Sequence, residues 1–147
     1  MQIRVKHGVY VNKRPADVFA YLSDPHKMPE WQSSNFKVTR TTNACTKGRL
    51  QHGTKVHDSR NVLGQEIEGE WEVVGFEQDK RLALRVTKGP VPWEMSYMLE
   101  PVESGTFLSA EGHGDLGKVP MSAAAANRSC HRLLEQDLAT LADILDK

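Results

Sequence analysis

The sequence predicts an α+β fold in which a curved antiparallel sheet of about seven strands wraps around one long C-terminal helix, with two short helices after the first strand. Two observations predict this architecture. The middle of the chain reads as successive hairpins whose apolar residues stay on one face of a sheet. Residues 121–146 carry apolar side chains at helical spacing, as in a long amphipathic helix.

Composition limits the classes of function. The chain has 147 residues, so we expect residues 1–147 to form one domain. Its 19 basic and 19 acidic residues balance, which argues against nucleic acid as a main partner. No apolar run approaches the roughly 20 residues that span a membrane, and the N-terminal residues lack the apolar core of a signal peptide. We therefore expect a cytoplasmic protein, monomeric or homodimeric, with Cys45 and Cys130 as free thiols.

The first elements follow from local signals. Residues 2–11 alternate as a strand, and Pro15 stands where helices often begin. The pair Asp24-Pro25 ends that helix. A short second helix is expected at residues 26–32, and a second strand at residues 36–42.

Hairpin pairing predicts which side chains share a face, because the numbers of opposed residues in a hairpin sum to a constant. A turn at Leu63-Gly64 places Trp71 opposite Val56 on the inner face. The other face then carries an acidic row that we expect to be solvated: Glu66, Glu68, Glu70 and Glu72. Turns near residues 77–78, 88–91 and 101–104 extend the pattern. The pairs predicted across them are Trp71 with Leu84, Leu84 with Met95, Leu82 with Tyr97, and Tyr97 with Leu108.

The long helix is bulky in its C-terminal half and small in its N-terminal half. Its apolar stripe consists of Cys130, Leu134, Leu138, Leu141 and Leu145. Before Cys130 the stripe continues with Asn127 and small alanines, which cannot fill the concave side of a sheet. Either this space is a cavity, or side chains such as Phe19, Trp31 or Phe36 fill it.

The predicted cavity combines large and small side chains with a few polar groups, as small-molecule sites usually do. The residues expected to line it are Asp58, Arg60, Gly69, Trp71, Met95, Tyr97, Ala110 and Gly112 of the sheet, and Ala123, Asn127 and Cys130 of the helix. Its aromatic residues fit a plain core as well as a ligand platform. Tyr97 offers a hydroxyl that can donate a hydrogen bond or act as an acid.

Asp58 and Arg60 are the most informative polar residues, because the pairing places both on the inner face. Charged side chains are rarely buried unless they are paired. One interpretation is a polar clamp for a ligand carbonyl, hydroxyl or carboxylate. The other is a structural ion pair at the edge of the sheet.

No catalytic residue, cofactor or metal site is predicted. The histidines lack the His-x-x-x-His spacing of a metal site. A general base must reach a pocket substrate, and only His7 has a suitable position, since His57 and His113 fall on the solvated face. Cys130 is expected to be a small buried hydrophobic residue, because apolar surroundings raise a thiol pKa.

Short sequence motifs spread over nearly the whole chain resemble those of a known family. They are Pro15 to Pro25, Pro29-Glu30-Trp31, Gly53-Thr54, Arg60 to Gly64, Glu72 to Glu77, Lys80 to Ala83, Gly89-Pro90, Gly105-Thr106 and Asp137 to Leu141. With the order of elements, they resemble the START-like (SRPBCC) superfamily of helix-grip folds, and most closely its polyketide cyclase/dehydrase branch. The resemblance implies binding of a small, largely apolar molecule such as a lipid or polyketide. It implies no catalytic residue.

Three functions therefore remain open. The first is a binding module for a small apolar ligand. The second is a polyketide cyclase, aromatase or dehydratase, in which Asp58, Arg60 and Tyr97 would supply acid, base and orientation. The third is a protein-interaction module resembling chaperone activators, which would have a filled interior and an exposed apolar patch.

Overall fold

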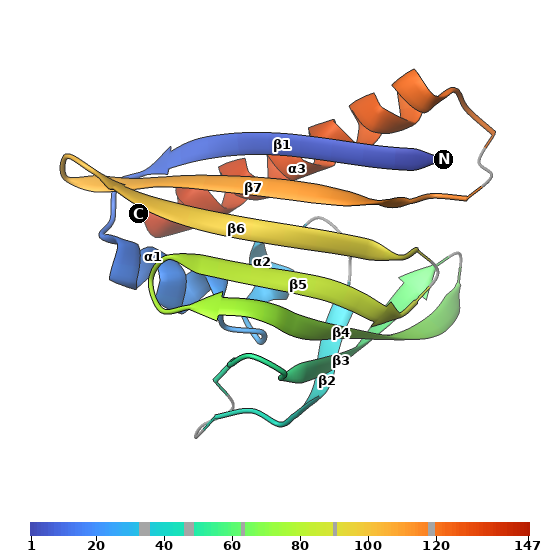
Figure 1. Ribbon diagram of the computed structural model, residues 1–147, viewed down its shortest axis with the longest axis horizontal. Helices are drawn as coiled ribbons and strands as arrows, with labels where there is room; N and C mark the ends of the chain where they lie inside the picture. Colours follow the sequence, from blue (N-terminus) through green and yellow to red (C-terminus); the bar gives the residue numbers. More distant parts are fainter. Residues whose placement is uncertain (33–35, 46–48, 63, 90, 118–119) are drawn as a thin grey trace.

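The computed structural model describes residues 1–32, 36–45, 49–62, 64–89, 91–117 and 120–147. Within these ranges it contains one seven-stranded sheet and three helices (Figure 1). In chain order the elements are β1 (Gln2–Val11), α1 (Pro15–Leu22), α2 (Met28–Trp31), β2 (Phe36–Thr42), β3 (Lys55–Val62), β4 (Gln65–Glu77), β5 (Arg81–Lys88), β6 (Trp93–Val102), β7 (Gly105–Asp115) and α3 (Ala123–Leu145).

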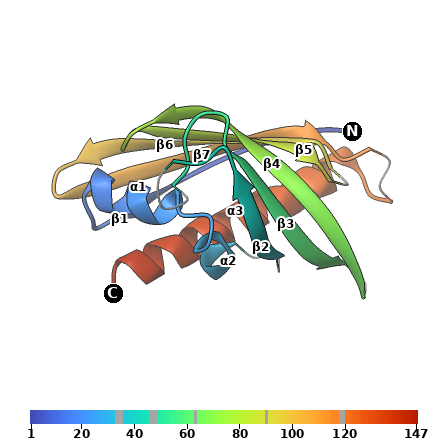
Figure 2. The same cartoon turned by 90° about the horizontal axis from the view of Figure 1, so that it is seen from below.

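The sheet has the strand order β1-β7-β6-β5-β4-β3-β2, and every neighbouring pair is antiparallel. The first strand thus pairs with the last, while the strands between them follow the chain. Figure 2 shows the three helices on the same side of the curved sheet, with α3 lying along it. This arrangement confirms the predicted helix-grip fold.

The helix boundaries have local causes. Pro15 opens α1, where a missing N–H costs no intrahelical hydrogen bond. The Ser23 hydroxyl donates to the carbonyl oxygen of Phe19 at 2.6 Å and helps to end this helix. At the start of α3 the Ser122 hydroxyl accepts a hydrogen bond from the Ala125 N–H at 3.1 Å, as an N-cap serine does.

Two of the predicted registers are confirmed. Trp71 lies opposite Val56 across β3 and β4. Across β5 and β6, Leu82 faces Tyr97 and Leu84 faces Met95. Leu63 of the first predicted turn and residue 90 of the third lie outside the described residues.

The other two registers differ from the predicted ones. At Trp71 and Tyr97 the difference is two residues, so both side chains kept their predicted face, whereas beyond the bulge the β4–β5 register differs by three residues. Trp71 faces Val86 instead of Leu84, because a three-residue loop with Asp79 at φ 63° joins β4 to β5 and a bulge at Val74 compensates for its odd length. Tyr97 faces Ala110 instead of Leu108, because β6 and β7 meet in a two-residue turn at residues 103–104.

The core lies between the concave face of the sheet and the helices. Leu134, Leu138 and Leu141 of the predicted α3 stripe are buried, and Trp71 is buried as expected. Phe19 of α1 packs edge-on against Phe76, with ring centroids 5.4 Å apart. The interior is therefore filled mainly by helix side chains that meet alternate residues of the strands.

The outer face of the sheet is less uniformly charged than the sequence suggested. Glu66 and Glu68 are exposed, but Glu70 and Glu72 are partly covered. Glu70 accepts a hydrogen bond from the Thr87 hydroxyl at 2.6 Å, and this contact lowers the pKa of the carboxyl group. Exposed apolar side chains also occur on this face: Tyr10, Met98 and Phe107.

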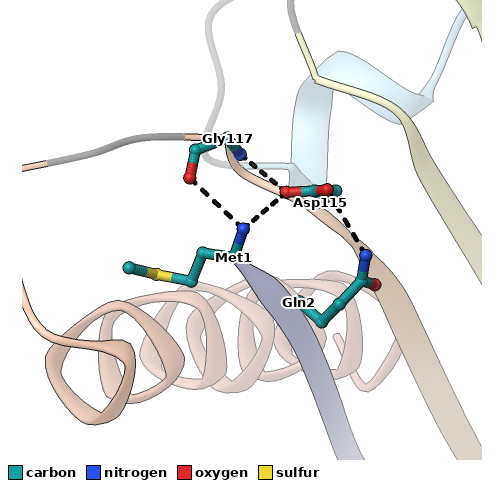
Figure 3. A network of polar contacts seen from close by, with 4 residues as sticks. All are labelled: Met1, Gln2, Asp115 and Gly117. Carbon is teal, nitrogen blue, oxygen red and sulfur yellow. Dashed lines mark hydrogen bonds and ion pairs between the residues drawn. The ribbon is translucent and has the colours of Figure 1, made fainter.

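Polar contacts hold β1 at its start and along its free edge. At its start, the Met1 amino group lies 2.8 Å from Asp115 Oδ1, and Gly117 N–H donates to the same oxygen at 2.8 Å (Figure 3). The contact with the amino group lowers the pKa of Asp115. At its free edge, α3 supplies two side-chain partners: Asn127 Nδ2 donates to the carbonyl oxygen of Arg4, and His131 Nε2 contacts that of Lys6. The helix thereby covers an otherwise open sheet edge.

Among the described residues, no helix is both long enough and apolar enough to cross a membrane. The two cysteines are free, as predicted.

The contrast between two leucines of α3 tests the packing. Leu138 is fully buried, whereas Leu133 is 49 % exposed. Leu138→Ala should lower the free energy of unfolding by about 2–5 kcal/mol, because it leaves a cavity under the sheet. Leu133→Ala is the matched control and should change it by about 0.5 kcal/mol or less. Urea unfolding measures both, and equal effects would contradict the placement of α3.

Candidate functional site

A pocket of about 450 Å³ lies between the concave face of the sheet and helices α2 and α3. Its floor comes from β3, β4, β5 and β6, and its walls come from the two helices. Most of its lining is apolar or aromatic. The apolar members include Met28, Trp31, Phe36, Ile67, Trp71, Leu84, Val86, Trp93, Met95, Leu133 and Leu134.

Seven of the eleven residues predicted to form a site border this pocket: Asp58, Arg60, Gly69, Trp71, Met95, Tyr97 and Cys130. The pairing of strands brought the first six to one face, and the stripe of α3 supplied the seventh. That these residues bind a ligand stays a prediction.

Ala110, Gly112, Ala123 and Asn127 do not border the pocket. A Cβ atom at Gly112 would lie 2.9 Å from Trp93 and 3.0 Å from Met95, so these side chains already occupy the space above it. Ala123 is exposed, and Asn127 donates to β1. Ala110 is buried opposite Tyr97.

The pocket meets α3 at a different position from the predicted one, for a physical reason. The small residues of its N-terminal half let the helix close onto β1, and Ala126 is buried in that contact. The pocket instead meets α3 farther along, from Cys130 to Asp137. Of the proposed fillers, Phe19 packs into the core, while Trp31 and Phe36 reduce the space and become walls of the pocket.

Asp58 is the most buried charged group at the pocket, with 3 % of the residue exposed. Its Oδ2 atom lies 3.4 Å from an Arg60 nitrogen, a long contact for a hydrogen bond. Its Oδ1 atom has no hydrogen-bond partner among the described residues. A Cβ atom at Gly69 would lie 2.5 Å from this oxygen, so the glycine makes room for the carboxyl group.

Two of the neighbours that hold Arg60 in position are Asp58 and Phe36. Besides its contact with Asp58, the guanidinium lies over the Phe36 ring, 4.8 Å from the centroid. Its side chain is about one-third exposed. The Asp58–Arg60 pair therefore stands at the border between the apolar interior and water.

Trp31 provides a second unpartnered polar atom. The residue is 2 % exposed, and its indole Nε1 has no hydrogen-bond partner among the described residues. Its ring meets Tyr97 edge-on, with centroids 6.0 Å apart. A buried polar group without a partner costs about 1–3 kcal/mol. Trp31 was not predicted as a polar anchor, because nothing in the sequence fixes how α2 docks.

Tyr97 and Cys130 keep their protons. Burial, with a smaller contribution from the charge of Asp137, raises the pKa of the Tyr97 hydroxyl far above its usual value. Tyr97 can therefore donate a hydrogen bond but cannot serve as a base near neutral pH. Burial also raises the pKa of the Cys130 thiol, as expected for a small hydrophobic residue.

No histidine borders the pocket among the described residues. His7, the candidate base, instead meets His131 edge-on, with ring centroids 5.7 Å apart. His57 lies 3.5 Å from Glu70, and His113 lies 3.0 Å from Glu94. General-base chemistry by histidine has no support in this pocket.

Comparisons with known proteins agree with this geometry. The sequence model of the family described as polyketide cyclase / dehydrase and lipid transport matches residues 2–146. No curated protein matches the chain in sequence.

Three solved structures illustrate the shared fold. A START superfamily protein from Mycobacterium smegmatis has a TM-score of 0.76 and 15% identity, with 97% of each chain covered. The di-domain ARO/CYC StfQ from the steffimycin biosynthetic pathway has a TM-score of 0.72 and 13% identity over 99% of this chain and 51% of that one. The Aha1 dimer from Colwellia psychrerythraea has a TM-score of 0.66 and 16% identity over 98% and 96%.

The raised pKa of Tyr97 predicts a loss of stability in alkali. Above about pH 10 the unfolded chain releases the tyrosine proton, while the folded chain retains it. The free energy of unfolding should therefore fall as pH rises past that value. The free energy of unfolding of the Tyr97→Phe variant should fall less steeply. The difference between the two slopes should be about 1.4 kcal/mol per pH unit. Urea unfolding at several alkaline pH values measures the two slopes, and identical slopes would contradict the buried hydroxyl.

Proposed function

We propose that this chain, which belongs to the polyketide cyclase/dehydrase and lipid transport family, binds a small, largely apolar molecule in the pocket between the sheet and α3. One observation carries the proposal. Asp58 and Trp31 border the pocket, and each has one buried polar atom, Oδ1 and Nε1, without a hydrogen-bond partner among the described residues. A ligand with matching polar groups would satisfy both once the two side chains turn toward it.

The chemistry of these two atoms limits the kinds of ligand that fit the pocket. An ionised carboxylate only accepts hydrogen bonds, so Asp58 favours a ligand with a hydroxyl or N–H group. The indole N–H only donates, so Trp31 favours a carbonyl or hydroxyl oxygen. The remaining lining favours a flat or aliphatic apolar body, and the volume of about 450 Å³ is typical of small-molecule sites.

A cyclase, aromatase or dehydratase activity is the second candidate. The specific observation in its favour is the Asp58 carboxyl group beside Arg60 at the edge of an apolar pocket. There Asp58 could exchange a proton with a bound polyketide-like substrate while Arg60 holds an oxygen. In this candidate Tyr97 acts only as a donor, because its pKa is raised.

An interaction role similar to that of chaperone activators has weaker support. The outer face has exposed apolar residues, but the interior keeps a pocket of about 450 Å³. The cytoplasm stays our expected location, in keeping with the two free thiols. A monomer or a homodimer stays our expectation for the oligomeric state.

A pair of phenylalanine substitutions on α3 tests occupancy of the pocket. Cys130 borders it, whereas Ala123 is exposed outside it. Cys130→Phe should fold and lose uptake of the neutral apolar dye N-phenyl-1-naphthylamine, because the new ring occupies the space. Ala123→Phe should bind the dye as the wild type does. Fluorescence titration measures both, and equal binding by both variants would place dye uptake elsewhere.

A pair of matched ligands tests whether Asp58 forms a hydrogen bond with the ligand. The wild type should bind 2-naphthol at least about tenfold more tightly than 2-methylnaphthalene, because a hydrogen bond to a charged group is worth about 1.5–3 kcal/mol. Asp58→Leu should abolish this preference and leave the affinity for 2-methylnaphthalene unchanged. Calorimetry measures the four affinities. Equal affinity of the wild type for both ligands would remove Asp58 from the binding site.

A further inference from the structure

Three side chains with metal-binding atoms meet outside the pocket, where α3 crosses the edge of β1. They are His7 on β1, and His131 and Glu135, one turn apart on α3. Their ligand atoms all lie within 4.8 Å of one another. Both histidines are partly buried, and Glu135 is exposed. The cluster therefore has two histidines held by their surroundings and one carboxylate on the side that ions can reach from solvent.

The hydrogen bonding of His131 is that of a metal ligand. Its Nε2 atom lies 3.0 Å from the carbonyl oxygen of Lys6, which can only accept, so Nε2 carries the hydrogen. In a neutral ring the Nδ1 atom then has a free lone pair, and it lies 2.9 Å from Glu135 Oε1. Two acceptors face each other at this point, so a proton or a cation must lie between them. Histidines that bind metals usually donate their other N–H to a carbonyl or carboxylate in this way.

We propose that His7, His131 and Glu135 bind one divalent transition-metal ion of the Zn²⁺ type. Imidazole nitrogens suit zinc, copper and nickel, whereas magnesium and calcium prefer oxygen ligands. Two histidines and one carboxylate also form a familiar zinc-binding set that leaves a fourth position for water. Bonds of about 2.1 Å require ligand atoms roughly 3.4 Å apart. Glu135 Oε1 already lies nearer to His131 Nδ1 than this, at 2.9 Å, and its exposed side chain can adjust by rotating. The most distant pair, within 4.8 Å, has to approach by about 1.4 Å at most.

The position of the site gives the metal a structural effect. His7 belongs to the edge strand, while His131 and Glu135 belong to the helix that covers this edge. A bound ion therefore ties β1 to α3. Because the ion binds the folded chain in preference to the unfolded one, it should raise the melting temperature. A search for paired histidines misses this set, since the i,i+4 partner of His131 is a glutamate.

The experiment is a calorimetric titration of the full chain with Zn²⁺ alone at about pH 7.5, where neutral histidine predominates. We expect one equivalent to bind and the melting temperature to rise. His7→Ala and Glu135→Gln should each weaken binding at least tenfold. Replacing Zn²⁺ by Co²⁺ should give visible absorption bands that both variants lose.

His113 supplies the matched control. Its Nε2 atom lies 3.0 Å from Glu94, so it forms a histidine–carboxylate pair of the same kind, but it belongs to no three-ligand cluster among the described residues. His113→Ala should bind Zn²⁺ as the wild type does. Glu135→Gln alters an exposed side chain, so it tests the site even if His7→Ala folds poorly. Absence of stoichiometric binding by the wild type, or binding that survives Glu135→Gln unchanged, would overturn the proposal and favour a simple imidazolium–carboxylate pair.

Discussion

The structure depends on one constraint: the sheet has a single apolar face, and one helix is too narrow to cover it. Seven strands about 4.8 Å apart span roughly 29 Å, whereas a helix with its side chains is about 10 Å wide. The helix α3 lies over β1, and α1 packs beside β6 and β7. The inner faces of β3, β4 and β5 are left to α2 and to large side chains. The pocket is the part of that area which they do not fill.

The hairpin pattern predicted faces better than partners. Apolar residues every second position specify which side of a strand is buried, and this property survives any shift of two residues. Trp71 was therefore placed correctly on the inner face, although its partner on β5 is Val86. The loop with Asp79 and the bulge at Val74 could not be predicted, because both depend on the twist of neighbouring strands.

The same distinction applies to the site: contacts set by strand register were predicted, and contacts set by helix docking were not. The Asp58–Gly69 contact was implied by the register of β3 and β4, and the structure contains it. Trp31 became a polar anchor only through the docking of α2, which no periodicity in the sequence encodes. Ala123 and Asn127 lie outside the pocket, because small helix residues permit two outcomes, an open space or a closer helix. The distance between α3 and β1 decides between them, and it depends on edge contacts far apart in the chain.

Those edge contacts connect the pocket to the rest of the molecule. On α3, Cys130, Leu134 and Asp137 face the pocket, whereas Asn127 and His131 reach the free carbonyl oxygens of β1. The same few turns of helix thus form a wall of the pocket and close the sheet edge. Asn127 and His131 are four residues apart, and their partners Arg4 and Lys6 are two apart, so the helix can satisfy both carbonyls in only one rotation about its axis. That rotation directs Cys130 and Leu134 toward the strands that carry Asp58 and Trp71. The identity of the residues at the edge therefore determines which residues of α3 a ligand would meet.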